Sequence, residues 1–194
     1  RVLHMASRQL NNRVFASIAH GLLHRCKLQI YHFNRRTGKQ SERIISPQRL
    51  AHYRDNWYLD SWCHMRKALR SFATDAIERV DLLEAETAKE ISDVQLEKVL
   101  GTGYGIFAGE RTREAVLRFT PDAARWVARE KWHSRQRGEY ERDGSYRLTV
   151  PYADETELVM DILRHGPDVE VISPARLRRN VHQRLLAATA GYDC

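Results

Sequence analysis

The chain has 194 residues, enough for one large domain or two small ones. Its 42% of hydrophobic residues excludes wholesale disorder, and no apolar run approaches the roughly 18 residues of a membrane span. The 32 basic side chains against 25 acidic ones give a formal charge of +7, which is compatible with a polyanionic partner. The three cysteines are far apart and lack metal-ligand spacing, which predicts reduced thiols in a cytoplasmic protein.

Residues 1–26 are predicted to form a linker helix. Apolar side chains recur there at helical spacing from Val14 to Leu23. The helical pattern is already under way at Arg1, so we expect a fragment whose preceding domain is absent.

Residues 27–84 are predicted to form a small Sm-like or SH3-like β-barrel. From Lys27 the apolar period changes to two, and polar or glycine-containing turns separate the extended segments. About five short strands with tight connections are typical of such a barrel. We expect extended segments at residues 27–33, 42–45, 48–53, 57–64, 69–72 and 77–83, with a short helix near residues 74–77.

The most informative segment runs over residues 56–72, which hold two of the four tryptophans. Alternation places Trp57 and Leu59 toward the core and sets Tyr58 and His64 on the opposite face of the strand. Trp62 fits either the core or a groove. Aromatic, imidazole and nearby guanidinium groups on one sheet face predict a binding surface.

Residues 85–114 are predicted to form a connector. Residues 84–93 are acidic and helix-prone, and a helical stripe continues to Leu100. Residues 101–109 contain four glycines. A glycine-rich loop can cradle phosphate, but this one lacks the Lys-Ser/Thr ending of a P-loop, so an inter-domain turn is the simpler interpretation.

Residues 115–194 are predicted to form a ferredoxin-like domain, which makes the chain an α+β protein. The expected order is β-α-β-β-α-β. Thr120 and Pro121 predict the start of the first helix, Asp143-Gly144 predicts a hairpin turn, and Gly166 ends the second helix. A final helix over residues 174–190 carries four arginines that form either a solvated face or a partner surface.

Sequence motifs favour neither an enzyme nor a metal or cofactor site. There is no nucleophile elbow, Walker lysine or paired His-Glu metal motif. His20 and His24 have the spacing of metal ligands, but no third ligand accompanies them, so a helix surface is the simpler interpretation. Cys63 and His64 are adjacent in a predicted strand and therefore point to opposite faces.

Two ordered sets of motifs carry a family resemblance. The first resembles the WYL domain of bacterial transcriptional regulators: Ser46-Pro47, Trp57-Tyr58-Leu59, Trp62-Cys63-His64, Arg66, Leu69-Arg70 and Phe72. The second resembles the WCX extension that follows it: Leu117-Arg118-Phe119-Thr120, Trp132-His133, Gln136, Asp143-Gly144, Gly166 and Pro174. Gly103-Tyr104-Gly105-Ile106-Phe107 resembles the connector of the family.

The resemblance implies the sensing and dimerisation part of a regulator. Such proteins carry an N-terminal winged helix-turn-helix domain that binds double-stranded operator DNA, and they are typically homodimers. Their WYL barrel is a ligand sensor, and in DNA-damage regulators the ligand is single-stranded DNA. Two departures from the family are Ser61, where alanine is frequent, and Ala73 and Ala76, where basic residues are frequent.

The residue chemistry supports a single-strand site on its own. Basic groups follow a nucleic-acid backbone and aromatic rings stack on its bases. The candidate nucleic-acid-binding residues in the barrel are Arg43, Ser46, Arg49, Tyr53, Tyr58, His64, Arg66, Arg70 and Arg79. Trp132, His133 and Gln136 are candidates for a far wall. Arg79 fits a salt bridge equally well, and Trp132 fits a domain anchor.

Two other functions remain open from the sequence. One is a sensor of a small anionic nucleotide in the same site. The other is an oligomerisation module without a ligand.

Overall fold

The computed structural model describes residues 8–35, 37–101, 104–105 and 112–192. The chain divides into two compact units, Arg1–Leu100 and Gly101–Cys194, and each is described by itself. Most of the predicted glycine-rich connector, residues 101–109, lies outside the described residues. In the part that the structure describes, no helix is long and apolar enough to cross a membrane.

The first unit begins with α1 (Asn12–Leu23), which is shorter than the predicted helix. The Asn11 side chain accepts hydrogen bonds from the backbone N–H groups of Arg13 and Val14, so it caps the helix there. Residues 8–11 are not helical, and residues 1–7 lie outside the described part. Val14 and Ile18 are buried against the barrel core.

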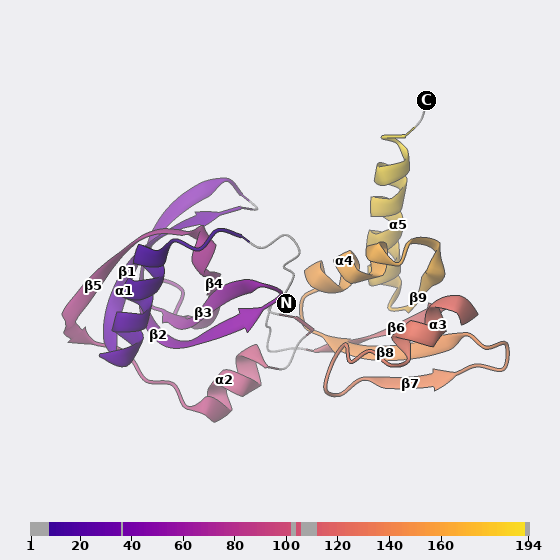
Figure 1. Cartoon of the computed structure of the whole chain (residues 1–194), viewed down its shortest axis with the longest axis horizontal. Helices are drawn as coiled ribbons and strands as arrows, with labels where there is room; N and C mark the ends of the chain where they lie inside the picture. The colour runs from indigo at the N-terminus through magenta and orange to yellow at the C-terminus, as the bar shows by residue number, and fades with distance from the viewer. Residues whose placement is uncertain (1–7, 36, 102–103, 106–111, 193–194) are drawn as a thin grey trace. The chain divides into compact units, whose positions relative to one another are not determined.

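Five antiparallel strands form the barrel sheet (Figure 1). They are β1 (Cys26–Asn34), β2 (Lys39–Tyr53), β3 (Asn56–Cys63), β4 (Ala68–Ala73) and β5 (Ile77–Thr87). Their order is β4-β3-β2-β1-β5, so the chain returns β5 beside β1 after the short helix η1 (Thr74–Ala76). The order of elements and the short helix confirm the predicted Sm-like or SH3-like layout.

Inward-facing side chains of alternate strand positions fill the barrel core. The fully buried members include Leu28, Ile30, Ile45 and Leu59. Leu59 is therefore a core residue, as predicted. Trp57 is only half-buried and packs at the margin, where its ring lies 5.4 Å from that of Phe15.

The strand β2 is one continuous strand of 15 residues, and not the two segments predicted. Pro47 lies inside it, where its register with β3 shifts between Pro47 and Arg49. The ladder to β1 has already ended at Ile45. Pro47 therefore interrupts few ladder hydrogen bonds, which explains why a proline is tolerated there.

The acidic segment of residues 84–93, predicted to be helical, is strand at residues 84–87 and neither strand nor helix at residues 88–92. β5 continues to Thr87, which pairs with Cys26 beyond a register shift. The helix α2 (Asp93–Leu100) starts only at Asp93. Pairing with β1 thus overrides the helical propensity of residues 84–87.

The second unit has the predicted ferredoxin-like order. Its elements are β6 (Arg113–Phe119), α3 (Pro121–Val127), β7 (Arg137–Tyr140), β8 (Tyr146–Tyr152), α4 (Thr156–Arg164), η2 (Gly166–Asp168), β9 (Val169–Ser173) and α5 (Ala175–Thr189). The sheet order is β7-β8-β6-β9, and all neighbours are antiparallel. The two β-α-β halves interleave in this order, which is the split βαβ arrangement.

Local sequence signals set the boundaries in this unit. The Thr120 side chain accepts a hydrogen bond from the backbone of Ala123, and Pro121 is the first residue of α3. Gly144 has a φ of +84° in the hairpin turn, and Gly166 has a φ of +54° after α4. The α3 helix ends at Val127.

Candidate nucleic-acid interface

A buried hydrogen-bond relay lies at one end of β2 and β3. The Ser46 hydroxyl is fully buried and lies 2.9 Å from Nε2 of His64. Its oxygen accepts the backbone N–H of Lys89 at 2.8 Å. When Nε2 of His64 carries no proton, the Ser46 hydroxyl donates to it.

The electrostatic surroundings of His64 favour this neutral form. Burial lowers its pKa, and the positive charges of Lys27 and Lys89 lower it further, while Glu86 acts in the opposite direction. Lys27 itself forms an ion pair with Glu86 at 2.8 Å. Ser46 and His64, both predicted as site residues, are thus held together in a basic environment.

The half-buried Trp62 lies beside this relay. In the strand register it faces Ser46 on β2 and Leu69 on β4. The ammonium nitrogen of Lys89 lies 3.4 Å from the centroid of its indole ring, which is a close cation–π contact. We call Lys27, Ser46, Trp62, His64 and Lys89 together the Trp62 surface.

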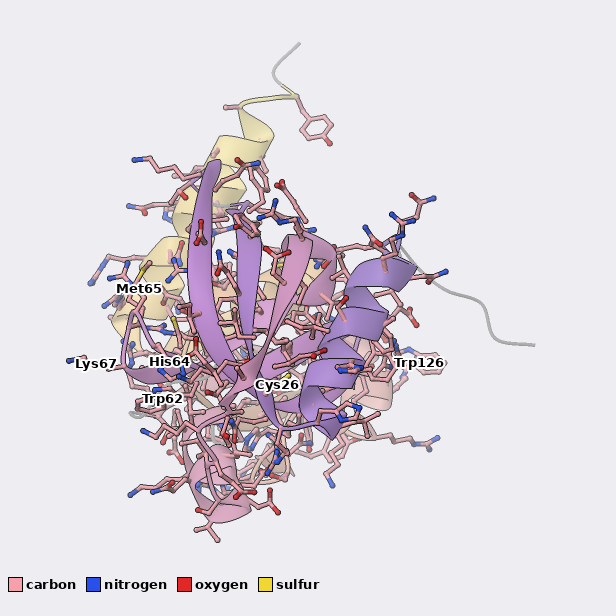
Figure 2. All side chains as sticks on the ribbon, turned by 90° about the vertical axis from the view of Figure 1, so that its left-hand side faces the viewer. Cys26, Trp62, His64, Met65, Lys67 and Trp126 are labelled. Carbon is pink, nitrogen blue, oxygen red and sulfur yellow. The ribbon has the colours of Figure 1, made fainter. Side chains whose placement is uncertain are left out.

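The turn of residues 64–67 borders the Trp62 surface. Met65, Arg66 and Lys67 are exposed. Figure 2 shows the side chains of Trp62, His64, Met65 and Lys67 gathered in one region of the barrel. The guanidinium of Arg43 lies 3.6 Å from the sulfur of Met65. Of the predicted site residues, the fold therefore brings Arg43, Ser46, His64 and Arg66 to one end of the barrel.

Arg49 has a structural role on the same sheet face. Its guanidinium bonds Asp60 at 2.8 Å and Glu97 of α2 at 2.7 Å. Asp60 is 2% exposed and also accepts a hydrogen bond from Ser71. Arg49 thus neutralises a buried carboxylate and ties α2 to the barrel.

Tyr58 and Tyr53 lie together at the other end of β2 and β3. Their ring centroids are 6.5 Å apart. Tyr58 and His64 are six positions apart along the chain, which corresponds to about 20 Å of strand. The predicted aromatic-imidazole face therefore exists, but its two ends are too far apart to form one small pocket.

Two predicted arginines lie away from the Trp62 surface. Arg70 is exposed and pairs directly with Ser61 of β3, so it lies on the side of the sheet that Ser61 faces. The sequence predicts it on the other side, with Tyr58 and His64. Arg79 lies on β5, stacked 3.8 Å over the Tyr31 ring and paired with Asp81 at 3.0 Å. The salt-bridge interpretation of Arg79 is therefore realised.

Gln136 and His133, in the second unit, hold a loop together. The Gln136 carboxamide oxygen accepts the backbone N–H groups of Trp132 and His133, and its nitrogen donates to the carbonyl of Glu130. Nδ1 of the 9% exposed His133 accepts the backbone N–H of Arg135. Burial, followed by the charge of Arg135, lowers the pKa of His133.

The Trp132 ring packs within the second unit. Its centroid lies 5.7 Å from Phe119, 5.9 Å from Tyr104 and 5.6 Å from His165, with which it stacks. Its indole N–H donates to Glu130 at 2.8 Å. These contacts make Trp132 a packing residue of its own unit.

Sequence reasoning missed Lys27 and Lys89 as parts of the site. Lys89 was hidden because its segment was predicted to be helical. The alternation of Lys27, Gln29 and Tyr31 was a usable signal, because the intervening Leu28 is buried and the three must point outward.

Cysteine and histidine groups show no metal centre in the described ranges, where no three His, Cys, Asp or Glu side chains are placed to hold an ion. The rings of His20 and His24 lie 4.1 Å apart, and His20 faces Glu84 at 3.5 Å. Cys26 and Cys63 are free and buried.

Comparisons with known proteins identify the class of both units. The WYL domain model matches residues 13–82, and the WCX domain model matches residues 111–189. The chain therefore belongs to the WYL-domain proteins that carry a WCX domain after the barrel.

Two curated relatives match the chain. The curated Protein PafC of Mycobacterium tuberculosis (strain CDC 1551 / Oshkosh) is 28% identical over 152 residues, which cover 78% of this chain and 46% of the relative. The protein of strain ATCC 25618 / H37Rv matches equally. The chain thus spans about half the length of the curated relatives it matches.

Solved structures also resemble the chain. A CRISPR Cas-related protein matches with a TM-score of 0.56 and 10% identity, covering 93% of this chain and 51% of that one, which shows a shared fold. Proteasome accessory factor B/C (PafBC) of Arthrobacter aurescens matches with a TM-score of 0.42 and 22% identity, covering 96% of this chain and 29% of that one.

Proposed function

We propose that this chain is the effector-sensing region of a bacterial transcriptional regulator and that its WYL barrel binds short single-stranded DNA at the Trp62 surface. The observation that carries the proposal is the Lys89 ammonium 3.4 Å from the Trp62 ring centroid, beside the basic turn of residues 64–67. The membership of this chain in the WYL-domain family supports a regulatory role. The resemblance of the chain to DNA-damage regulators supports a nucleic-acid effector.

Single-strand recognition requires cations for phosphates and an aromatic face for bases. Arg66 and Lys67 are exposed and form no ion pair within the described ranges, so their charges are available to phosphates. The Trp62 indole offers a stacking face worth about 1–3 kcal/mol per base. Neutral His64 adds a polar edge next to that face.

Sensing also requires a change that other domains can follow. We propose that the full regulator is a homodimer in which the WCX domain contributes to dimerisation. Bound single-stranded DNA would favour one dimer state, and a separate operator-binding domain would respond to it. This population shift needs different effector affinities in the two states.

Fluorescence anisotropy with a labelled oligonucleotide at several salt concentrations tests the proposal. We expect affinity to fall as salt rises, with a log–log slope of about −0.7 for each neutralised phosphate. The double substitution Arg66→Gln and Lys67→Gln should weaken binding and flatten that slope. Lys39→Gln, an exposed charge in the distant β1–β2 hairpin, is the matched control and should change little.

Three outcomes would contradict the proposal or redirect it. Absence of binding at low salt, or binding without salt dependence, would refute a single-strand site. Competition by mono- or dinucleotides as strong as that of the oligonucleotide would favour a small-nucleotide sensor. Purified protein that is oligomeric and binds no nucleotide of any length would favour an oligomerisation module.

A further inference from the structure

Residues 88–91, between β5 and α2, form an extended strap along β2 that belongs to neither strand nor helix. Side chains of β2 hold its backbone. Gln48 donates to the carbonyl of Lys89 at 2.7 Å and accepts the N–H of Ile91 at 3.0 Å. Ser46 accepts the N–H of Lys89 at 2.8 Å.

Further contacts fix the first part of the strap. The backbone N–H of Ala88 donates to the carbonyl of Arg25 at 2.7 Å, and the Arg25 guanidinium pairs with Glu90. The Arg25–Glu90 pair is largely exposed and therefore contributes little to stability. The strap has no strand-type ladder of backbone hydrogen bonds, and its side chains are exposed or only half-buried. The few polar contacts named above are therefore what holds it in place.

The strap places a cation on the surface that a base would use. The Lys89 ammonium lies 3.4 Å from the Trp62 ring centroid, within the thickness that a stacked base would occupy. A base cannot stack on that ring face while Lys89 covers it. In the free protein, the Lys89 ammonium therefore occupies the position over the Trp62 ring that a stacked base would take.

We propose that residues 88–91 are a displaceable strap that closes the Trp62 face until single-stranded nucleic acid replaces Lys89. This inference rests on the proposed function, because it assigns a regulatory device to the same site. The apparent affinity for the oligonucleotide is the affinity of the open form multiplied by the fraction of molecules in which the strap is open. A strap that is mostly closed therefore lowers it. Once displaced from the ring, the Lys89 ammonium can pair with a phosphate of the bound strand.

The strap also links the site to the end of the first unit. It continues directly into α2, whose Leu96 is buried and whose Glu97 pairs with Arg49. Displacement of residues 88–91 would therefore pull on the helix that ends this unit. The coupled element has two arrangements, closed and open, which is the requirement for transmitting occupancy.

Gln48→Ala is the informative variant, because it removes two hydrogen bonds to the backbone of the strap and leaves the side chains of Trp62, His64 and every proposed phosphate ligand, Lys89 included, in place. We expect it to raise oligonucleotide affinity about threefold to tenfold, since each lost hydrogen bond favours the open strap. Gln40→Ala is the matched control, because Gln40 is a glutamine of β2 whose side chain donates to the exposed Glu78 and, among the described residues, makes no contact with the strap. A melting curve for each variant checks that the barrel is intact.

Hydrogen exchange of the whole chain, with and without oligonucleotide, gives the second readout. We expect the N–H groups of Lys89 and Ile91 to exchange faster when the oligonucleotide is bound, and faster in free Gln48→Ala than in free wild type. Binding with unchanged or slower exchange at these positions would overturn the strap while leaving the nucleic-acid site intact. If neither the wild type nor Gln48→Ala binds the oligonucleotide, both the displaceable strap and the nucleic-acid site are overturned.

Discussion

Trp62 and Trp132 were both candidates for a ligand surface, and their surroundings differ in one decisive respect. Trp132 is enclosed by Tyr104, Phe119 and His165, which occupy its ring as packing partners. Trp62 has the ammonium of an exposed lysine on its ring. A tryptophan ring that packs against neighbouring rings stabilises the fold. A tryptophan ring that is covered by a flexible lysine side chain can bind a ligand once the lysine moves away.

Removing the packed ring should have the largest effect. We expect Trp132→Ala to lower the free energy of unfolding of the second unit by about 3 kcal/mol, because the change leaves a cavity beside Phe119 and His165. Urea denaturation followed by circular dichroism measures it. Trp126→Ala is the matched control, since this tryptophan of α3 is 74% exposed (Figure 2) and its loss should cost less than about 0.5 kcal/mol. Equal effects of the two substitutions would show that Trp132 is not a packing residue.

Removing the covered ring should act on binding more than on stability. We expect Trp62→Ala to weaken oligonucleotide affinity about fivefold to a hundredfold, which corresponds to the loss of one stacked base. Anisotropy titration of Trp62→Ala and Trp132→Ala side by side tests the contrast directly. If Trp132→Ala remains folded and loses as much affinity as Trp62→Ala, the distinction between the two rings is wrong.

Histidine titration offers a smaller effect that both units share. Burial is the first cause that lowers the pKa of His32 and His64 in the first unit and of His133 and His165 in the second. As the pH falls, these histidines therefore become protonated in the unfolded chain, at a pKa of about 6.5, before they do so in the folded protein. Stability should be full above that pH and decline as the pH falls through the lowered folded-state values.

Chemical denaturation at pH 8, 7, 6 and 5 measures this decline. Glu141 does not contribute in this window, since its ordinary pKa of 4.5 lies below pH 5 and hydrogen bonds from Arg147 first, and then from Ser145 and Arg118, lower it to about 2 in the folded protein. His64→Gln should flatten the part of the profile that belongs to the first unit. A profile that rises on acidification would contradict buried neutral histidines.

Most of the fold was predictable because local signals and tertiary pairing agree. The capping of α3 by Thr120, the Asp143-Gly144 turn and the alternation around Leu59 all predict what the chain adopts. The prediction of helix at residues 84–87 was wrong because pairing with β1 overrides their helical propensity. Propensity is a weak local preference, and partners distant in sequence decide such a segment.

The candidate site was predictable only in part for the same reason. Ser46 and His64 meet because the register of β2 and β3 aligns them, and each was visible as a polar group near Trp62. Lys89 reaches the site only through the path of the chain after β5, which no local pattern encodes. The ion pair of Arg49 with Asp60 was not predicted, because Asp60 looked like another surface residue in the strand.

Arg70 provides the smallest and sharpest test of the surface. The sequence favoured it as a phosphate ligand, yet it pairs with Ser61 and lies on the side of the sheet that Ser61 faces. We therefore expect Arg70→Ala to change oligonucleotide affinity by less than about twofold, while Arg66→Ala changes it several-fold, because only Arg66 lies in the turn beside Trp62. Parallel anisotropy titrations at one salt concentration compare the two losses of a single positive charge. If Arg70→Ala proves the more damaging, the ligand follows the barrel face of Ser61 and Cys63, and the Trp62 face is not its primary contact.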